Sequence, residues 1–212
     1  MNNLETLIKS RRSAMKFVSG VEIPKSDLDE IFSISKFAPS AFNTQPTHYV
    51  VVTDNDLKEK VYEAAYKQYK VKTASALIIA LGDTKAYKEI SRINEGMLHL
   101  GILSKQEFDK EVEDVNNFYD SRGETFQKED AIRNACLSAM QLMLIAKDKG
   151  WDTCPMIGFD PDVLRQILNI PDQYVPALLI AMGKADTTKE RARGYRKPVG
   201  EFVSYNSSPV QQ

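Results

Sequence analysis

The stretch Pro39-Ser40-Ala41-Phe42-Asn43-Thr44-Gln45-Pro46 leads into the apolar run 49–52, Tyr-Val-Val-Val. A loop bounded by prolines and rich in short polar side chains disfavours a helix, whereas consecutive β-branched residues are typical of a buried strand. Two later runs, 75–82 and 176–183, have the same apolar character. The sequence therefore predicts a few central strands, the first of which follows this loop.

The segments around these runs carry helix signals. Leu28 and Ile31 share one helical face, and their helix should end before Pro39, because the residue that precedes a proline is displaced from helical geometry. Asp160-Pro161 is a strong helix start, since a capping residue precedes a proline at the first helical position. We also expect helices over 2–10 and 54–67, and a turn over 153–160.

Two longer segments contrast in polarity. Residues 131–146 are apolar nearly all round, which is typical of a helix buried in the centre of a domain or in a subunit interface. Residues 85–130 are highly charged and helical in composition. Within them, 105–114 is too polar for a core, so we expect an exposed helix or a covering element there.

Size and charge limit the class of protein. The chain has 212 residues, enough for one large domain or two small ones. It contains no internal repeat and no low-complexity linker, so we expect one α+β domain over residues 1–212. The net charge of −1 argues against nucleic-acid binding through overall basic charge, so any recognition of anions must be local.

The cysteines and apolar runs indicate a compartment. Cys136 and Cys154 are the only cysteines, and their spacing is not that of a redox or zinc pair. No apolar signal segment opens the chain, and the longest nearly apolar run, 137–146, is about half the length that spans a bilayer. We expect a cytoplasmic location and no membrane association.

A small basic cluster lies near each end of the chain. Arg11, Arg12 and Lys16 surround the hydroxyl of Ser13, and Arg196 lies in the distant segment Gly-Tyr-Arg-Lys-Pro. Arginine offers a planar fork of donors that fits phosphate, and serine adds a short neutral donor. If folding brings Arg196 near Arg11, one phosphate could be held from both ends. The alternative is that both clusters are solvated surface.

Several kinds of catalytic site are missing from the sequence. It contains no G-x-G-x-x-G motif, no phosphate loop and no G-x-S-x-G nucleophile elbow. His48 and His99 are the only histidines, which leaves little room for acid–base chemistry by histidine and no His-x-x-x-His pair for a metal. The chain has few side chains suited to catalysis but has local clusters suited to binding an anion. This combination indicates that a bound cofactor carries the reaction.

Four segments together resemble the FMN-dependent nitroreductase family. They are 11–13 with Phe17, 38–46, 155–160 and 196–198, in the family's order and spacing. The resemblance implies an α+β fold with a mainly antiparallel sheet surrounded by helices. It also implies an intertwined homodimer with two FMN sites at the subunit interface, which reduces nitroaromatics, quinones and related acceptors with NADH or NADPH.

The same resemblance implies roles for individual residues. Arg11 and Arg196 would hold the FMN phosphate, with Arg12 and Ser13 along the phosphate, ribityl chain and pyrimidine edge. The partner subunit would supply Pro39, Ser40, Ala41 and Asn43 to the isoalloxazine. Gln68 would bond the polar rim of the flavin, and the backbone at Met156, Ile157 and Gly158 would pass close to the ring. No side chain is expected to act as a catalytic nucleophile, because the flavin carries the chemistry.

The chain departs from the family pattern at two positions. Met15 stands where the family commonly has arginine or lysine, a cation that would favour reduced flavin. Either Lys16, Lys70 or Lys72 substitutes for it, or the flavin is less easily reduced. We hypothesise that one of Lys70 and Lys72 substitutes. Thr47 stands where the family often has tryptophan, which leaves the packing beneath the loop open.

The implied mechanism has two half-reactions at one site, in which NAD(P)H gives hydride to the flavin and the acceptor then takes its place. Residues 105–122 are the candidate wall or lid over that site. The alternatives are a flavoprotein of the same fold with another reaction, such as dehalogenation, flavin reduction or flavin breakdown, and a non-enzymatic flavin-binding protein. An anion-binding module without flavin ranks last.

Overall fold

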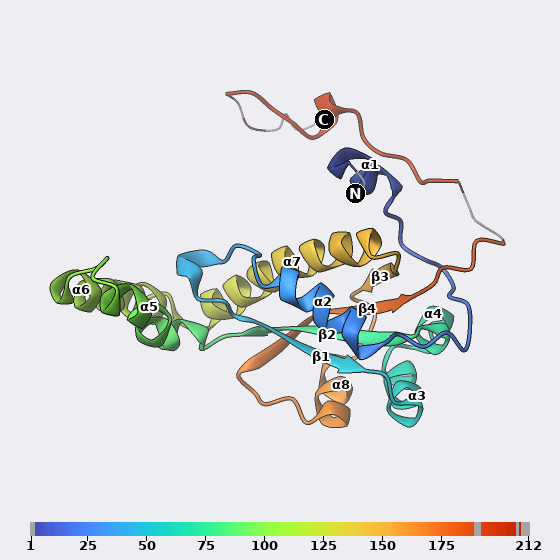
Figure 1. Cartoon of the computed structure of the whole chain (residues 1–212), viewed down its shortest axis with the longest axis horizontal. Coiled ribbons are helices and arrows are strands. Elements are labelled where there is room, and N and C mark those ends of the chain that lie inside the picture. The colour runs from blue at the N-terminus through green and yellow to red at the C-terminus, as the bar shows by residue number, and fades with distance from the viewer. Residues whose placement is uncertain (1–2, 189–191, 207, 209–212) are drawn as a thin grey trace.

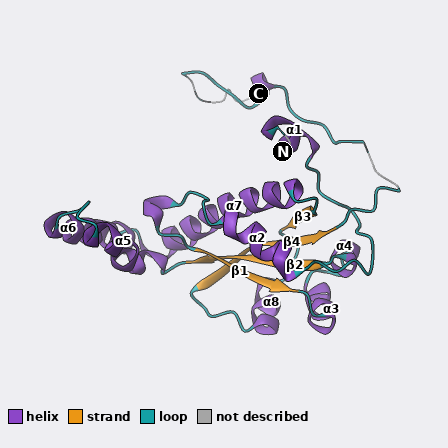
Figure 2. Ribbon diagram, in the orientation of Figure 1, coloured by secondary structure: helices purple, strands orange, loops and turns teal. Residues whose placement is uncertain are grey.

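A four-stranded antiparallel sheet lies at the centre of the computed structural model, which describes residues 3–188, 192–206 and 208 (Figures 1 and 2). The strand order is β1-β2-β4-β3. The strands are β1 (Thr47–Val52), β2 (Ala76–Asp83), β3 (Asp152–Met156) and β4 (Tyr174–Gly183). The three strands expected from the sequence are confirmed, and the sheet is antiparallel as the family resemblance implied.

The fourth strand, β3, is a correction to the sequence analysis. Residues 153–156 were expected to form part of a turn, but they pair with β4. The strand was missed because Pro155 lies within it. Proline has no backbone N–H to donate to a ladder, so a proline argues against a central strand. Since β3 is an edge strand, it tolerates this proline. In β4, Pro176 is tolerated beside the register shift at Ala80/Leu81 of β2.

Both faces of the sheet are covered by helices. Alternate residues of β2 face opposite layers: Leu77 and Ile79 pack in one apolar cluster, and Ile78 and Ala80 in another. The first cluster includes residues of α3 (Asn55–Ala64), α4 (Tyr69–Thr73) and α8 (Pro161–Leu168). The second includes residues of α2 (Lys25–Ser35) and α7 (Gly123–Asp148). This two-sided burial explains why β2 is apolar throughout.

The helix expected over 54–67 ends earlier than predicted. Asp54 caps α3 as expected, since its side chain accepts a hydrogen bond from the Leu57 N–H at 2.8 Å. The chain then turns, because Tyr66 and Lys67 both adopt left-handed backbone angles. A separate short helix, α4, follows Gln68.

The apolar segment 131–146 lies within the 26-residue helix α7. Its inner side packs against the sheet through residues such as Ala139 and Leu142, as the prediction of a buried helix required. Leu137 and Met140 lie on another side and are 53% and 40% exposed in the single chain. The helix therefore has an apolar surface left over after the sheet is covered.

Residues 86–120 form an arm that extends away from the sheet (Figure 1). It consists of η2 (Ala86–Glu89), α5 (Ile90–His99) and α6 (Lys105–Asp120). The prediction that 105–114 is not core is confirmed, since the buried residues of α6 are Val115 and Tyr119. A capping box formed by Ser104 and Glu107 starts α6.

The first helix and the segment 192–206 lie near each other, on the α7 side of the sheet (Figure 1). Helix α1 (Leu4–Ser10) is followed by isolated bridges that join Ser13 to Thr153 and Phe17 to Ala185. Near the other end, the short helix η3 spans Val199–Glu201. Within the described residues, no helix is long and apolar enough to cross a membrane.

The packing of α7 onto β2 can be tested at a glycine. A Cβ at Gly82 would lie 2.6 Å from the carbonyl oxygen of Ala131, whereas a Cβ at Gly96 in α5 would meet no atom within 4 Å. We expect Gly82→Ala to lower the free energy of unfolding by about 2 kcal/mol or more. The matched change Gly96→Ala should be neutral or raise it by up to about 1 kcal/mol. Denaturant unfolding of both variants measures this, and equal effects would contradict the proposed close packing.

Candidate functional site

The first basic cluster lies where α1 ends and the chain joins β3. Arg11 is the C-cap residue of α1, and its N–H bonds the carbonyl of Leu7. Ser13 bridges to Thr153, and the Ala14 N–H donates to the Thr153 carbonyl at 3.1 Å. The cluster is therefore attached to the first residues of the edge strand.

Folding brings both basic segments together in one hollow, the basic pocket. Its volume is about 170 Å³, and it is lined by Arg11, Arg12, Ser13, Arg193, Gly194 and Arg196. These segments are far apart in the sequence but line the same pocket in the fold. Arg193 was not singled out from the sequence, although it lies one residue before the segment 194–198 that was.

Arg11 has the electrostatic character of an anion-binding residue. Its Nη1 atom is buried and has no hydrogen-bond partner among the described residues. Burial lowers the pKa of Arg11, and the nearby cations Arg193 and Arg196 lower it further. A buried guanidinium nitrogen that lacks a partner and lies near other cations is unfavourable unless an anion joins it. The pocket therefore fits a phosphate group.

Arg193 and Arg196 mainly organise the pocket backbone. The Arg193 side chain donates to the carbonyls of Lys9 and Arg11, and so fastens the C-terminal segment to the end of α1. Arg196 Nη1 donates to the carbonyls of Gly194 and Tyr195, at 3.1 and 2.9 Å. Arg193 closes the pocket, and Arg196 holds the loop that forms its wall.

Gln68 joins a second part of the predicted site. Its Nε2 atom donates to the carbonyl of Gly158 at 2.6 Å and to that of Ala65 at 3.1 Å. Within the adjacent turn, Met156 is buried and Ile157 is 80% exposed. The amide of Gln68 therefore holds the 156–158 turn in place, a contact that the sequence analysis did not anticipate.

The basic pocket and this turn lie along one strand. Ser13 is bridged to Thr153, and Ile157 follows four residues later, which corresponds to about 13 Å of extended chain. Arg11, Arg12, Ser13, Gln68, Met156, Ile157, Gly158 and Arg196 thus form one group.

The proline loop, residues 39–46, lies elsewhere in the single chain. Asn134 of α7 accepts a hydrogen bond from the Ala41 N–H at 2.9 Å, whereas β3 begins after the C-terminal end of α7. The 14 residues from Asn134 to Asp148 span about 21 Å of helix. Figure 1 shows the loop and α1 near different ends of α7. The fold therefore does not bring Pro39, Ser40, Ala41 and Asn43 to the basic pocket of the same chain.

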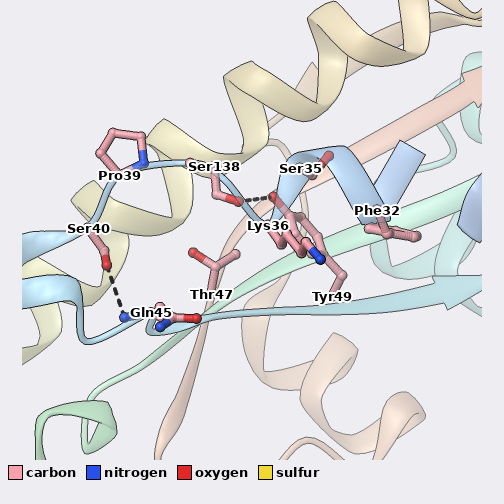
Figure 3. Close-up of a pocket in the computed structure, with 10 residues that line it drawn as sticks. Phe32, Ser35, Lys36, Pro39, Ser40, Gln45, Thr47, Tyr49 and Ser138 are labelled. Atoms are coloured by element: carbon pink, nitrogen blue, oxygen red, sulfur yellow. Dashed lines mark hydrogen bonds between the residues drawn. The ribbon is translucent and has the colours of Figure 1, made fainter. Parts of the chain in front are cut away.

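The proline loop has a well-defined conformation. Phe42, Asn43 and Gln45 adopt left-handed backbone angles. The Ser40 hydroxyl accepts a hydrogen bond from the Gln45 N–H at 3.0 Å, which ties the two ends of the loop (Figure 3). Short polar side chains supply such bonds, which is the physical reason for the composition of this stretch.

A cavity of about 260 Å³ lies beneath the proline loop (Figure 3). Thr47 forms part of its wall, together with Tyr49, whose hydroxyl lies 2.7 Å from the Ser138 hydroxyl. Burial raises the pKa of Tyr49 to about 12, so its hydroxyl stays neutral. The departure at Thr47 is thus accompanied by empty space beneath the loop.

The three lysines considered in place of a cation at Met15 differ in their surroundings. Lys16 pairs with Asp186 at 2.9 Å, and Lys72 lies 3.9 Å from Glu59 and over the ring of Tyr62. Lys70, two residues after Gln68, has no ion-pair partner among the described residues. Of the two lysines preferred from the sequence, Lys70 is the one left available beside the site.

Comparison with known proteins identifies the family. A family model described as Nitroreductase family matches residues 8–184. MhqN of Bacillus subtilis, named for NAD(P)H nitroreductase activity, is 55% identical over 199 residues, which are 94% of this chain and 97% of that protein.

Solved structures agree with the family model. The crystal structure of the nitroreductase YdfN of Bacillus subtilis has a TM-score of 0.93 and 53% identity, and covers 95% of this chain and 97% of that one. A nitroreductase of Exiguobacterium sibiricum, solved in complex with FMN, has a TM-score of 0.88 and 27% identity, and covers 97% of this chain and 98% of that one. The chain belongs to the nitroreductase family of FMN- and NAD(P)H-dependent oxidoreductases.

Proposed function

We propose that this protein transfers hydride from NADH or NADPH, through FMN, to nitroaromatic, quinone or related acceptors. The observation that carries the proposal is the buried Nη1 atom of Arg11, which lacks a hydrogen-bond partner among the described residues and lies in a pocket of cations. A cofactor phosphate supplies the charge that this pocket requires. Bound FMN would accept hydride from the nicotinamide and release it to the acceptor.

The residues around the basic pocket would bind and orient the cofactor. Arg11 and Arg196 would hold the phosphate from two sides, with Arg12 and the Ser13 hydroxyl nearby. The Ile157–Gly158 backbone, held by Gln68, would lie against the polar rim of the ring. None of these groups need act as a nucleophile or as a proton donor, in agreement with the scarcity of catalytic side chains.

We propose that the active form is a homodimer in which each FMN lies at the interface. Two observations support it. The proline loop lies far from the basic pocket of its own chain, so Pro39, Ser40, Ala41 and Asn43 could reach a cofactor only in a second copy. Leu137 and Met140 of α7 leave an exposed apolar surface suited to such an interface.

The arm would form one wall of the acceptor site. Its helix α6 is polar on most of its surface and lies beyond the edge of the sheet, as a covering element would. It contacts the proline loop, because Phe42 packs edge-on against Phe118 with the ring centroids 4.9 Å apart. We retain residues 105–122 as the candidate lid on this basis.

The first prediction concerns the absorbance spectrum. The purified protein should show flavin bands, and NADH or NADPH added without oxygen should bleach them, with colour returning when a quinone is supplied. Bands that persist would favour the non-enzymatic flavin-binding alternative. Bleaching without turnover of any quinone or nitroaromatic would favour another reaction on the same fold. A colourless protein that does not take up added FMN would refute the proposal.

The second prediction concerns the contact between Arg11 and the cofactor phosphate. Arg11→Met should weaken FMN binding by about 10- to 100-fold, because a charge-assisted contact to phosphate is lost. The cofactor-free variant should unfold at no lower temperature than the parent, since an unpaired buried cation is removed. Arg92→Met, at an exposed arginine paired with Glu89, is the matched control and should leave FMN binding unchanged. Unaltered FMN binding in Arg11→Met would contradict the assignment.

The third prediction concerns the missing cation at Met15. Lys70→Ala should lower the midpoint potential of bound FMN, because a positive charge beside the ring favours the reduced cofactor. Lys72→Ala should change the potential little, since Lys72 is directed toward Glu59 and Tyr62. A spectroelectrochemical titration of both variants measures this. If neither substitution shifts the potential, the hypothesis of a substituting lysine is wrong.

A further inference from the structure

An aromatic cluster joins the arm to the start of α7 and reaches the proline loop. The cluster consists of Tyr87, Phe118, Tyr119 and Phe126, and the rings of Tyr87 and Tyr119 are stacked with centroids 4.6 Å apart at 11°. Phe42 of the proline loop packs edge-on against this cluster. Its centroid lies 4.9 Å from that of Phe118 and 6.1 Å from that of Tyr119. Aromatic pairs in this geometry stabilise each other beyond their area of contact.

Phe42 is held in a backbone conformation that phenylalanine rarely adopts. Its φ is 50°, in the left-handed region, and Asn43 follows with a φ of 53°. Such a conformation persists only where surrounding contacts enforce it. The contact with the aromatic cluster is one such constraint, so the shape of the proline loop depends on the arm.

A chain of hydrogen bonds joins the same two segments. The Tyr119 hydroxyl donates to Asp130 Oδ2 at 2.8 Å, and the Asp130 carbonyl accepts from the Asn134 side chain at 2.8 Å. Asn134 in turn accepts from the Ala41 N–H at 2.9 Å. The path therefore runs from the arm, through α7, to a loop residue expected to contact FMN.

Thr44 closes this path on the other side. Its side chain is buried and donates to the carbonyl of Ala41 at 2.9 Å. The Tyr119 hydroxyl also interacts with the Thr44 side chain. Burial and the neighbouring Asp130 raise the pKa of Tyr119, so that its hydroxyl remains a neutral donor. Tyr119 is thus linked to the Ala41 backbone by two routes, through Asp130 and Asn134 and through Thr44.

We propose that Tyr119 and Phe42 are positioning residues, which set the proline loop from the arm so that Ser40, Ala41 and Asn43 meet the cofactor. This rests on the proposed function, in which the loop contacts FMN bound by a second copy of the chain. The arm is then more than a wall over the acceptor site. A displacement of α6 would move the proline loop and so alter its contacts with the cofactor, because α6 and the loop are joined through Phe42 and Tyr119.

The chain offers a matched pair of tyrosines to test this. Tyr119 and Tyr87 are stacked on each other, each is 3% exposed, and each donates its hydroxyl to a carboxylate. The Tyr119 path leads to the proline loop, whereas Tyr87 donates to Asp120 within the arm, at 2.6 Å, and accepts from the Gln127 side chain of α7 at 3.2 Å. Both hydroxyls make partly buried hydrogen bonds, and only that of Tyr119 is linked to the loop.

Tyr119→Phe should weaken FMN binding about fivefold and shift the midpoint potential of the bound cofactor, because the support of Ala41 is loosened. Tyr87→Phe should leave both quantities within about twofold of the parent, with a similar loss of thermal stability. Fluorescence titration with FMN, potentiometry and thermal unfolding of the cofactor-free proteins provide the readouts. Equal effects of the two substitutions on FMN binding and potential would overturn the proposal.

A second pair tests the ring contact without hydroxyl groups. Phe42→Leu removes the ring by which the loop packs against Phe118. Phe126→Leu removes a ring that packs against Phe118 from α7. Only Phe42→Leu should weaken FMN binding. A parent protein that binds no FMN would refute the proposed function and this inference together. Normal binding by the parent with four equivalent variants would refute this inference alone.

Discussion

Strand β2 is buried on both of its faces, and the positions of the surrounding helices follow from this burial. Its alternate side chains enter two apolar clusters, so helices must cover the sheet on both sides. On one side, Gly82 lets α7 approach the strand so closely that a Cβ would overlap the Ala131 backbone. That contact sets the position of a 26-residue helix, and the helix sets the positions of the two parts of the site.

Helix α7 separates the parts of the site as well as supporting them. Asn134 holds the proline loop beside its first half, and the strand that carries the basic segment begins just beyond its C-terminal end. In the proposed homodimer, a second copy of the chain would supply the loop to the cofactor. The exposed Leu137 and Met140 fit the same arrangement, because an apolar surface on a long helix is stabilised when a second subunit covers it.

The sequence predicted much of the fold because its signals were local. The β-branched runs, the Asp54 cap and the Asp160-Pro161 start each specify a strand or a helix boundary within a few residues. Strand β3 was missed because a proline, Pro155, lies within it. Its pairing with β4 joins residues distant in the sequence, so no local pattern specifies it. The early end of α3 was missed for a related reason, since Tyr66 and Lys67 carry no glycine or proline signal for their left-handed turn.

The residue types of the candidate site can be read from the sequence: arginines and a serine suited to phosphate, a loop of short polar residues, and few side chains able to catalyse a reaction. The family can be read from it too, since the four motifs occur in one order. The fold is needed to show that Arg193 joins the basic pocket, that Gln68 holds the Gly158 carbonyl, and that Tyr119 is linked through Asp130 to Asn134, which holds the proline loop. These contacts join residues far apart in the chain, and no local pattern specifies which distant donor meets which acceptor.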